Sequence, residues 1–364
     1  MLFAYIYVPH QMEKMQEFID FVFYEVWCKA PIGLEFHPDL FKGKPELQGI
    51  MSEFGFAAQA PERGKEFYKD VKGIYVLFSS LSAQDIGQFK RWYQGNNNIE
   101  SVCANDPATQ VVRYSDIPVT HKKLVERLRA FFKDLYSKSL LGLAAIKDKI
   151  GDIDDHYKTF VATNNKKKCP FCGVNDLLGE YASKREAYDH YLPKALYPFN
   201  SINFRNLVPS CHHCNSSYKT SKDPAHPIKD PAGALQRRKV FYPYAMQAQS
   251  IEISVEIART DVDGLCPEDI DLQFGPAALN EEILTWRDVY GIDERYKDKL
   301  CGPDAKDWIE QFRILNRRSK ITADEYLEDI DTLDKFANSN FLKSAFVRAC
   351  KNKGLLQTLE KYKN

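Results

Sequence analysis

Two short cysteine-rich segments, CPFC at residues 169–172 and CHHCNSSYK at residues 211–219, decide how this chain of 364 residues folds. Between them lie YDHYLPK at residues 188–194 and NL at residues 206–207. The composition, with 44% hydrophobic and 27% charged residues, is that of an ordinary globular protein. We therefore expect the chemical specificity of the chain to be concentrated in residues 169–219.

The two cysteine pairs have the spacing of a tetrahedral metal site. Cys169 and Cys172 form one CxxC pair, Cys211 and Cys214 form the other, and 38 residues separate the pairs. Four thiolates directed toward one point suit Zn²⁺ with no open coordination position. A redox-active CxxC is the alternative, but two pairs at this spacing favour a structural zinc. Five further cysteines are scattered and are expected to be inert thiols: Cys28, Cys103, Cys266, Cys301 and Cys350.

Between the cysteine pairs and directly after the second pair, four side chains have the chemistry of a hydrolytic site. Asp189 and His190 are adjacent, and Asn206 and Asn215 follow. Neighbouring side chains on a strand point to opposite faces, so Asp189 and His190 can serve one site only where a bulge or a strand end turns the chain. Carboxylate and amide oxygens suit Mg²⁺ or Mn²⁺, and a neutral imidazole accepts a proton near pH 7. An isolated Asp-His pair is ordinarily a surface feature, and the nearby asparagines favour a site.

In these residues the stretch resembles the HNH endonucleases, the ββα-metal family, in the version held together by a CxxC…CxxC zinc. The resemblance implies a β-hairpin with His190 on its first strand, followed by a helix at SSYKTSKD with Asn215 at its start. It implies His190 as general base, Asp189 and Asn215 as ligands of a catalytic Mg²⁺ or Mn²⁺, and Asn206 as the residue that orients the His190 loop or strand through hydrogen bonds. The third family position is Asn here, and the Gly-Gly that often follows the Asp-His-x-x-Pro motif is missing.

Other polar residues of the stretch are candidates for contact with phosphate. Lys194 and Lys219 are expected to bind phosphates flanking the cut, with solvated surface as the alternative. His212 and His213 are expected to be exposed or to face phosphate, because four thiolates already fill the zinc shell. The tyrosines of residues 188–197 are expected to pack inside the module rather than to stack on bases.

The charge of the chain is concentrated in the same region. Lys+Arg and Asp+Glu both total 50, so the formal net charge of +0 predicts no nucleic-acid partner by itself. Residues 166–240, however, hold 13 basic and 6 acidic residues, a local excess of +7. Any nucleic-acid-binding surface is therefore expected in the central part of the chain.

The flanking regions predict two further domains around a central nuclease module at residues 151–245. Residues 1–150 are expected to form a small α/β recognition or regulatory domain that ends in a long helix from Thr120, and Ser82 is expected to cap an earlier helix. Residues 246–364 are expected to form a hairpin followed by helices, with Asn280 as a helix cap. The expected N-terminal strands are residues 3–8, 74–78 and 109–114, and the expected hairpin strands are residues 251–258 and 270–274. The predicted class is α+β.

The location expected for the chain is cytoplasmic, without a membrane partner. No apolar run approaches the roughly 20 residues that a membrane span needs. The first residues, MLFAYIYVPHQMEK, lack the basic region and the small-residue cleavage site of a signal peptide.

The function predicted from these features is that of a metal-dependent DNA endonuclease with two metals, zinc for the fold and Mg²⁺ or Mn²⁺ for the reaction. The residues of these motifs resemble those of HNH proteins from bacterial anti-phage systems. This resemblance implies an ATPase or sensor subunit as partner. Two alternatives stay open: a zinc-ribbon protein that binds nucleic acid without cutting it, and an HNH nuclease that acts on RNA. A pure binder has no need of Asp189, His190, Asn206 and Asn215.

Overall fold

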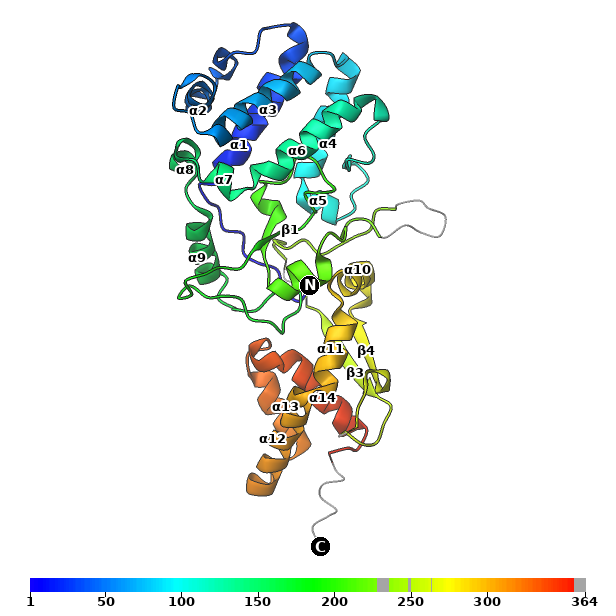
Figure 1. Cartoon of the computed structure of the whole chain (residues 1–364). Coiled ribbons are helices and arrows are strands. Elements are labelled where there is room, and N and C mark those ends of the chain that lie inside the picture. The colour runs from blue at the N-terminus through cyan, green and yellow to red at the C-terminus, as the bar shows by residue number, and fades with distance from the viewer. Residues whose placement is uncertain (228–235, 248–249, 263, 357–364) are drawn as a thin grey trace.

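The computed structural model describes residues 1–227, 236–247, 250–262 and 264–356, and it shows two lobes joined at a small central hairpin (Figure 1). The first lobe contains α1 (Glu13–Phe21), α2 (Pro45–Phe56), α3 (Glu62–Phe78), α4 (Ala83–Asn97), α5 (Ile99–Cys103), α6 (Lys122–Leu135), α7 (Lys138–Leu141) and α8 (Ala144–Ile150). The helix α9 (Ile153–Thr163) leads into the central hairpin, which consists of β1 (Tyr188–His190) and β2 (Leu207–Pro209). The second lobe contains β3 (Glu252–Ile257), β4 (Ile270–Gly275), α10 (Asn280–Tyr290), α11 (Ile292–Cys301), α12 (Pro303–Ser319), α13 (Ala323–Thr332) and α14 (Asn340–Asn352).

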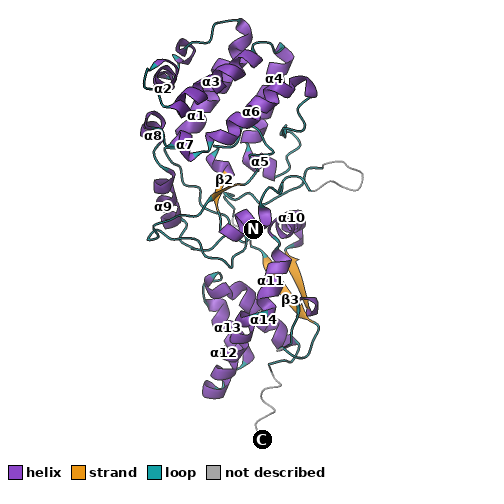
Figure 2. Cartoon of the chain, viewed as in Figure 1, coloured by secondary structure: helices purple, strands orange, loops and turns teal. Residues whose placement is uncertain are grey.

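The first lobe is helical, so the prediction of an α/β domain in residues 1–150 was wrong. Among the described residues, no strand precedes β1 (Figure 2). Residues 74–78, predicted as a strand, form the last turn of α3. Val71, Ile74 and Phe78 are buried there at helical spacing, and this periodicity outweighs the β-branched character of the short run.

The other two predicted strands are extended segments without a strand partner. Residues 3–8 bond irregular segments instead: the Tyr5 N–H donates to the Pro243 carbonyl at 2.8 Å, and the Ile6 N–H donates to Asn164 Oδ1 at 2.7 Å. In residues 109–114 the side chain of Asn96 takes the place of a neighbouring strand, because it bonds both the N–H of Val112 at 3.0 Å and its carbonyl at 2.9 Å. Both segments thus bond backbone groups to partners outside any sheet.

Helix boundaries in the first lobe follow capping residues. Ser82 caps α4 through a reciprocal capping box with Asp85, as predicted. The single long helix predicted from Thr120 is wrong, because α6, α7 and α8 are separate. A new cap causes the first break: the Ser137 hydroxyl accepts the N–H of Leu140 and starts α7.

The second lobe has the predicted hairpin and helices. β3 and β4 pair antiparallel, with Val255 opposite Leu272, and α14 packs against β3. The prediction that Asn280 caps a helix was wrong, because Leu279 occupies the cap position of α10 and Asn280 is its first helical residue. None of the helices in the described part of the chain combines the length and apolar character that a membrane span requires.

Two hydrophobic cores meet at the central hairpin. Tyr188 and Leu207 belong to the core of the first lobe, whereas Tyr191 and Val208 belong to the core that includes residues 1–8 and the second lobe. Strand β2 thus sends side chains into both cores, and so does β1 together with Tyr191, the residue that follows it. The hairpin is therefore fixed from both sides, although it is too short to form a core of its own.

Candidate functional site

The four cysteines predicted as zinc ligands come together in one buried cluster. The sulfur atoms of Cys169, Cys172, Cys211 and Cys214 lie within 4.8 Å of one another, and all four residues are buried. The Sγ atoms of Cys172 and Cys211 are 4.0 Å apart. A tetrahedral site with Zn–S bonds of about 2.3 Å requires sulfur separations of about 3.8 Å, so the four thiols fit zinc.

Arg295 of α11, which the sequence analysis did not single out, supports this cluster from the second lobe. Its Nη1 lies 3.1 Å from the sulfur of Cys214, and its Nη2 donates to Asn175 Oδ1 at 2.7 Å. Burial acts to lower the pKa of Arg295, but the combined interactions with Cys214, Cys172 and Cys211 outweigh this effect, so the pKa is raised. Arg295 lies 81 residues beyond Cys214 and no local motif marks it, so only the fold reveals this contact.

The hairpin and the helix after it hold the other candidate residues. β1 and β2 pair antiparallel, with His190 opposite Leu207. A π-helix follows at His213–Lys219, whereas a helix was predicted at residues 216–223. The helix begins earlier than predicted and includes Cys214, the second cysteine of its pair. It stops at Lys219 because Thr220 has a φ of 49°, and a right-handed helix requires a negative φ at each residue.

Asp189 and Lys219 form a buried ion pair between β1 and this helix. The Nζ atom of Lys219 lies 2.8 Å from Asp189 Oδ1 and 2.9 Å from the carbonyl oxygen of His190. Lys219 is 0% exposed and Asp189 is 3% exposed. Burial raises the pKa of the Asp189 carboxyl, although the neighbouring ammonium acts to lower it. The ammonium of Lys219 therefore faces Asp189 in this structure and not the solvent, where it was expected to meet phosphate.

His190 is the last residue of β1 and is held by the loop that follows it. Its Nε2 lies 2.9 Å from the carbonyl oxygen of Ser201, and its ring meets that of Tyr136 edge to face, with the ring centroids 4.9 Å apart. A carbonyl oxygen only accepts hydrogen bonds, so Nε2 carries the proton and Nδ1 has the lone pair. Burial, and then the charge of Lys194, lower the pKa of His190 to about 3. The imidazole is therefore neutral near pH 7.

Asn206 ties together the two ends of the loop after His190. Its Oδ1 accepts the N–H of Leu192 at 2.7 Å, and its Nδ2 donates to the carbonyls of Leu192 at 3.0 Å and Asn200 at 3.2 Å. Asn206 is 0% exposed, so these bonds are shielded from water. The side chain thus fixes the chain on both sides of residues 193–199, close to the Ser201 carbonyl that holds His190.

The other residues predicted for the site are less buried than Asp189 and Asn206. Asn215 is partly exposed on the π-helix, one residue after Cys214, and among the described residues its side-chain amide has no hydrogen bond. Lys194 donates to the Lys133 carbonyl at 3.3 Å, and its Nζ lies 5.6 Å from the ring centroid of Tyr136. His212 and His213 are exposed.

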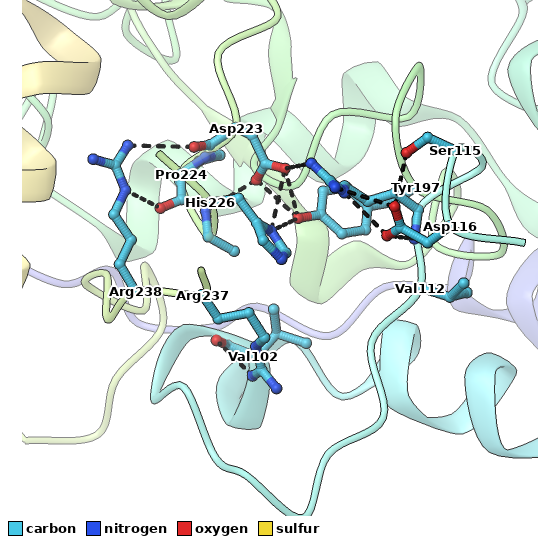
Figure 3. Close-up of polar contacts among 12 residues, drawn as sticks. Val102, Val112, Ser115, Asp116, Tyr197, Asp223, Pro224, His226, Arg237 and Arg238 are labelled. Atoms are coloured by element: carbon cyan, nitrogen blue, oxygen red, sulfur yellow. Dashed lines mark hydrogen bonds and ion pairs between the residues drawn. The ribbon is translucent and has the colours of Figure 1, made fainter. Parts of the chain in front are cut away.

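A polar network beyond the hairpin anchors the same loop to the first lobe (Figure 3). The Tyr197 hydroxyl lies 2.8 Å from both carboxylate oxygens of Asp223 and 2.9 Å from Nδ1 of His226. Arg113 pairs with Asp116 and approaches Asp223 at 3.9 Å. Because Tyr197 is buried, this network fixes the segment between His190 and Asn206 against residues of the first lobe.

The ion pair with Lys219 leaves one oxygen of the Asp189 carboxylate without a partner. Asp189 Oδ2 is buried and has no hydrogen-bond partner, which is costly for a carboxylate oxygen unless a further group binds it. A carboxylate and an amide oxygen are the ligand types that Mg²⁺ and Mn²⁺ prefer. Asp189 would hold such an ion through Oδ2 and Asn215 through its amide oxygen.

Together, the fold and the site define a helix-rich chain with two small antiparallel sheets and a buried four-cysteine cluster of metal-site geometry. The chain is similar to Septu protein PtuB of Bacillus thuringiensis, with 29% identity over 116 residues, which cover 32% of this chain and 42% of that protein. It is also similar to Protein ea31 of Escherichia phage lambda, with 36% identity over 74 residues, which cover 20% of this chain and 22% of that protein. It thus spans less than half the length of these two curated relatives. No family model matches the sequence, and neither does a solved structure.

Proposed function

We propose that this protein is a metal-dependent HNH endonuclease that hydrolyses phosphodiester bonds of DNA. His190 acts as general base on the attacking water, Asp189 and Asn215 hold a single Mg²⁺ or Mn²⁺, and Asn206 orients the loop that carries the partner of His190. The four cysteines hold a structural zinc. Together these residues supply a proton acceptor and a cation site, the two elements that phosphodiester hydrolysis by activated water requires.

The observation that carries the proposal is the hydrogen bond between His190 Nε2 and the Ser201 carbonyl at 2.9 Å. This bond fixes the proton on Nε2 and leaves the Nδ1 lone pair to accept a proton from water. The low pKa of His190, about 3, keeps the ring neutral in the neutral pH range. Asn206 holds the residues on both sides of the loop, so the ring orientation is set before substrate arrives.

The cation site and the lysines have separate roles in this proposal. When bound, a divalent metal would stabilise the negative charge that develops on the phosphate oxygens. Asp189 presents Oδ2 for it, while Lys219 holds Oδ1 and keeps the carboxylate in place. Lys194 adjoins His190 and contacts a flanking phosphate, whereas the buried Lys219 acts on Asp189 and not on the substrate.

The biological role proposed is that of an effector in anti-phage defence, acting beside an ATPase or sensor subunit. The partial similarity to the Septu protein PtuB supports this role. The first lobe, whose Tyr136 contacts the ring of His190, offers a direct route by which a partner's binding affects the site. Co-purification from the native host tests the role: it is supported if a nucleotide-hydrolysing subunit is recovered with the chain, and contradicted if the chain is recovered alone.

The proposed activity is tested by incubating the purified protein with supercoiled plasmid, with total RNA and with no substrate, in Mg²⁺, in Mn²⁺ and without added divalent metal. The proposal predicts plasmid cleavage that requires the added metal. Binding of plasmid without any cleavage would favour the zinc-ribbon binding protein. Cleavage confined to RNA would retain the mechanism and replace the substrate.

A further inference from the structure

A groove of about 660 Å³ lies where three parts of the chain meet. Its lining comes from residues 2–7, from Lys166 and Arg205 beside the central hairpin, from residues 244–246 and from residues 335–336 of the second lobe. The groove contains none of the residues proposed for the reaction. Its volume is in the range of pockets that receive a small ligand or a short chain segment.

The residues that line this groove carry positive charge. Lys166, Arg205 and Lys335 are all exposed, and no Asp or Glu is among the lining residues. Within the described ranges, none of the three cations lies within the 4.0 Å ion-pair distance of a carboxylate. Burial, and then the charge of Lys166, lower the pKa of Lys335, so an anion bound here would relieve a repulsion that already exists.

Aromatic rings hold the cations in place. The Nζ atom of Lys166 lies 4.7 Å from the ring centroid of Phe3 and 5.2 Å from that of Phe336. The guanidinium of Arg205 lies 4.4 Å above the ring of Tyr7. Cation–π contacts of this kind order flexible side chains without neutralising their charge. The groove therefore presents ordered positive charges to whatever binds it.

The groove is also lined by exposed apolar side chains. Ile6 is 63% exposed and Met246 is 99% exposed, and both line the groove. An acidic peptide would use the cations and the apolar side chains. Single-stranded nucleic acid would place its phosphates on the cations and would also stack its bases on planar groups. A base stacks on an Arg guanidinium as well as on aromatic rings, and Arg205 is exposed.

The groove is connected to the catalytic hairpin by direct hydrogen bonds. The hydroxyl of Tyr244 donates to the carbonyl of Leu207, the β2 residue opposite His190, and the hydroxyl of Tyr5 donates to the carbonyl of Pro209 at 3.2 Å. One layer of tyrosine side chains therefore separates the groove from β2. A nucleic acid bound in the groove lies beside the strand pair that carries His190.

We propose that this groove binds a single-stranded segment of nucleic acid flanking the cleavage site. A volume of about 660 Å³ receives a few nucleotides of one strand but not a duplex. The proposal rests on the nuclease function proposed above, because it assigns part of the substrate of the same site. It places the strand-holding surface at the junction of the N-terminal segment, the hairpin and the second lobe.

The test compares wild type with the triple variant Lys166→Gln, Arg205→Gln, Lys335→Gln. Binding of a short fluorescein-labelled oligothymidylate is measured by fluorescence anisotropy, without added divalent metal, from about 50 to about 200 mM salt. Each lost phosphate contact reduces the steepness of log affinity against log salt concentration by about 0.7. The triple variant should therefore show a slope shallower than that of wild type by about 2, and an affinity roughly tenfold weaker at the lowest salt. A matched triple variant on exposed lysines of α3 and α6, Lys69→Gln, Lys72→Gln, Lys123→Gln, should bind as wild type.

The proposal is overturned if the groove variant keeps the affinity and the salt slope of wild type, or if both triple variants lose affinity equally. It is also overturned if polyglutamate displaces the oligonucleotide from wild type at the same charge concentration, which would identify an acidic protein segment as the occupant. The binding measurement needs no catalysis. A protein that binds in the groove but never cuts would contradict the proposed nuclease function alone.

Discussion

The ammonium of Lys219 is 2.8 Å from Asp189 Oδ1 inside the protein, where neither side chain reaches solvent. The same nitrogen lies 2.9 Å from the His190 carbonyl, so one side chain joins the π-helix after the zinc cluster to the strand that carries His190. Two charges buried together stabilise the fold only as a pair. The position of the Asp189 carboxylate therefore depends on a residue 30 positions later in the chain.

Lys219→Met should lower the free energy of unfolding by about 3–5 kcal/mol, because it leaves the Asp189 charge buried without a partner. Adding Asp189→Asn should recover part of this loss, since the uncompensated charge is then removed. Chemical denaturation monitored by circular dichroism measures both effects. Lys158→Met, an exposed lysine of α9, is the control and should be nearly neutral. A Lys219→Met protein as stable as the control would show that the ion pair does not form.

Cys211→Ser should reduce bound zinc and lower the melting temperature strongly, because the hairpin has no core of its own. In zinc-finger peptides, zinc contributes on the order of 10 kcal/mol to folding. Metal analysis of the purified protein and differential scanning calorimetry measure the two quantities. Cys301→Ser, which lies outside the cluster, should change neither. Full zinc content with unchanged melting in Cys211→Ser would exclude a structural role for the cluster.

Arg295→Gln should weaken zinc binding by about 10–100-fold, because it removes the charged donor beside the Cys214 sulfur. Competition with a chromophoric chelator measures the affinity. The control is Lys297→Gln on the same helix, which should leave zinc affinity unchanged. If both variants release zinc at the same chelator concentration, Arg295 does not contribute to zinc affinity.

Stability should fall as the pH is lowered below about 6.5, with His156 as one cause. Its Nε2 lies 3.0 Å from the Val8 carbonyl and its Nδ1 accepts from the Tyr188 hydroxyl, so protonation of Nδ1 breaks the second bond. Burial lowers the pKa of His156 to about 4, so the unfolded chain binds more protons between these pH values. The contribution to the free energy of unfolding is present above pH 6.5 and should decrease by about 2 kcal/mol at pH 5.

Denaturation curves of wild type and His156→Gln between pH 5 and pH 7 check this assignment. The variant should be less stable at pH 7 and should show a shallower decline toward pH 5. Parallel pH dependences in the two proteins would assign the acid sensitivity to another group.

The fold was predictable where local pattern and packing agree. The β3–β4 hairpin and the Ser82 cap follow from alternation and from capping chemistry, and both predictions are confirmed. Residues 74–78 were mispredicted because a five-residue apolar run fits a strand or the end of a helix equally well, and only the longer period of α3 distinguishes them. Residues 3–8 have a strand-like composition, yet their partners are irregular segments far along the chain.

The candidate site was predictable to the extent that its chemistry is local. The CxxC spacing predicts the cysteine cluster, and that prediction is confirmed. Spacing does not reveal that Arg295 supports the cluster, that the Ser201 carbonyl holds His190, or that Tyr136 packs on its ring. Lys219 was expected at the surface, bound to phosphate or solvated, because most lysines are exposed. The structure buries it against Asp189, a contact across 30 residues that no local motif indicates.

The central claim is that His190 removes the proton from the attacking water, and nicking of supercoiled plasmid by His190→Ala tests it most directly. The substitution removes the base and leaves zinc content, melting temperature and plasmid affinity near those of wild type. The rate of Mg²⁺- or Mn²⁺-dependent nicking is then expected to fall by about 100-fold or more. A purified, folded His190→Ala protein that nicks plasmid at the wild-type rate would contradict the account.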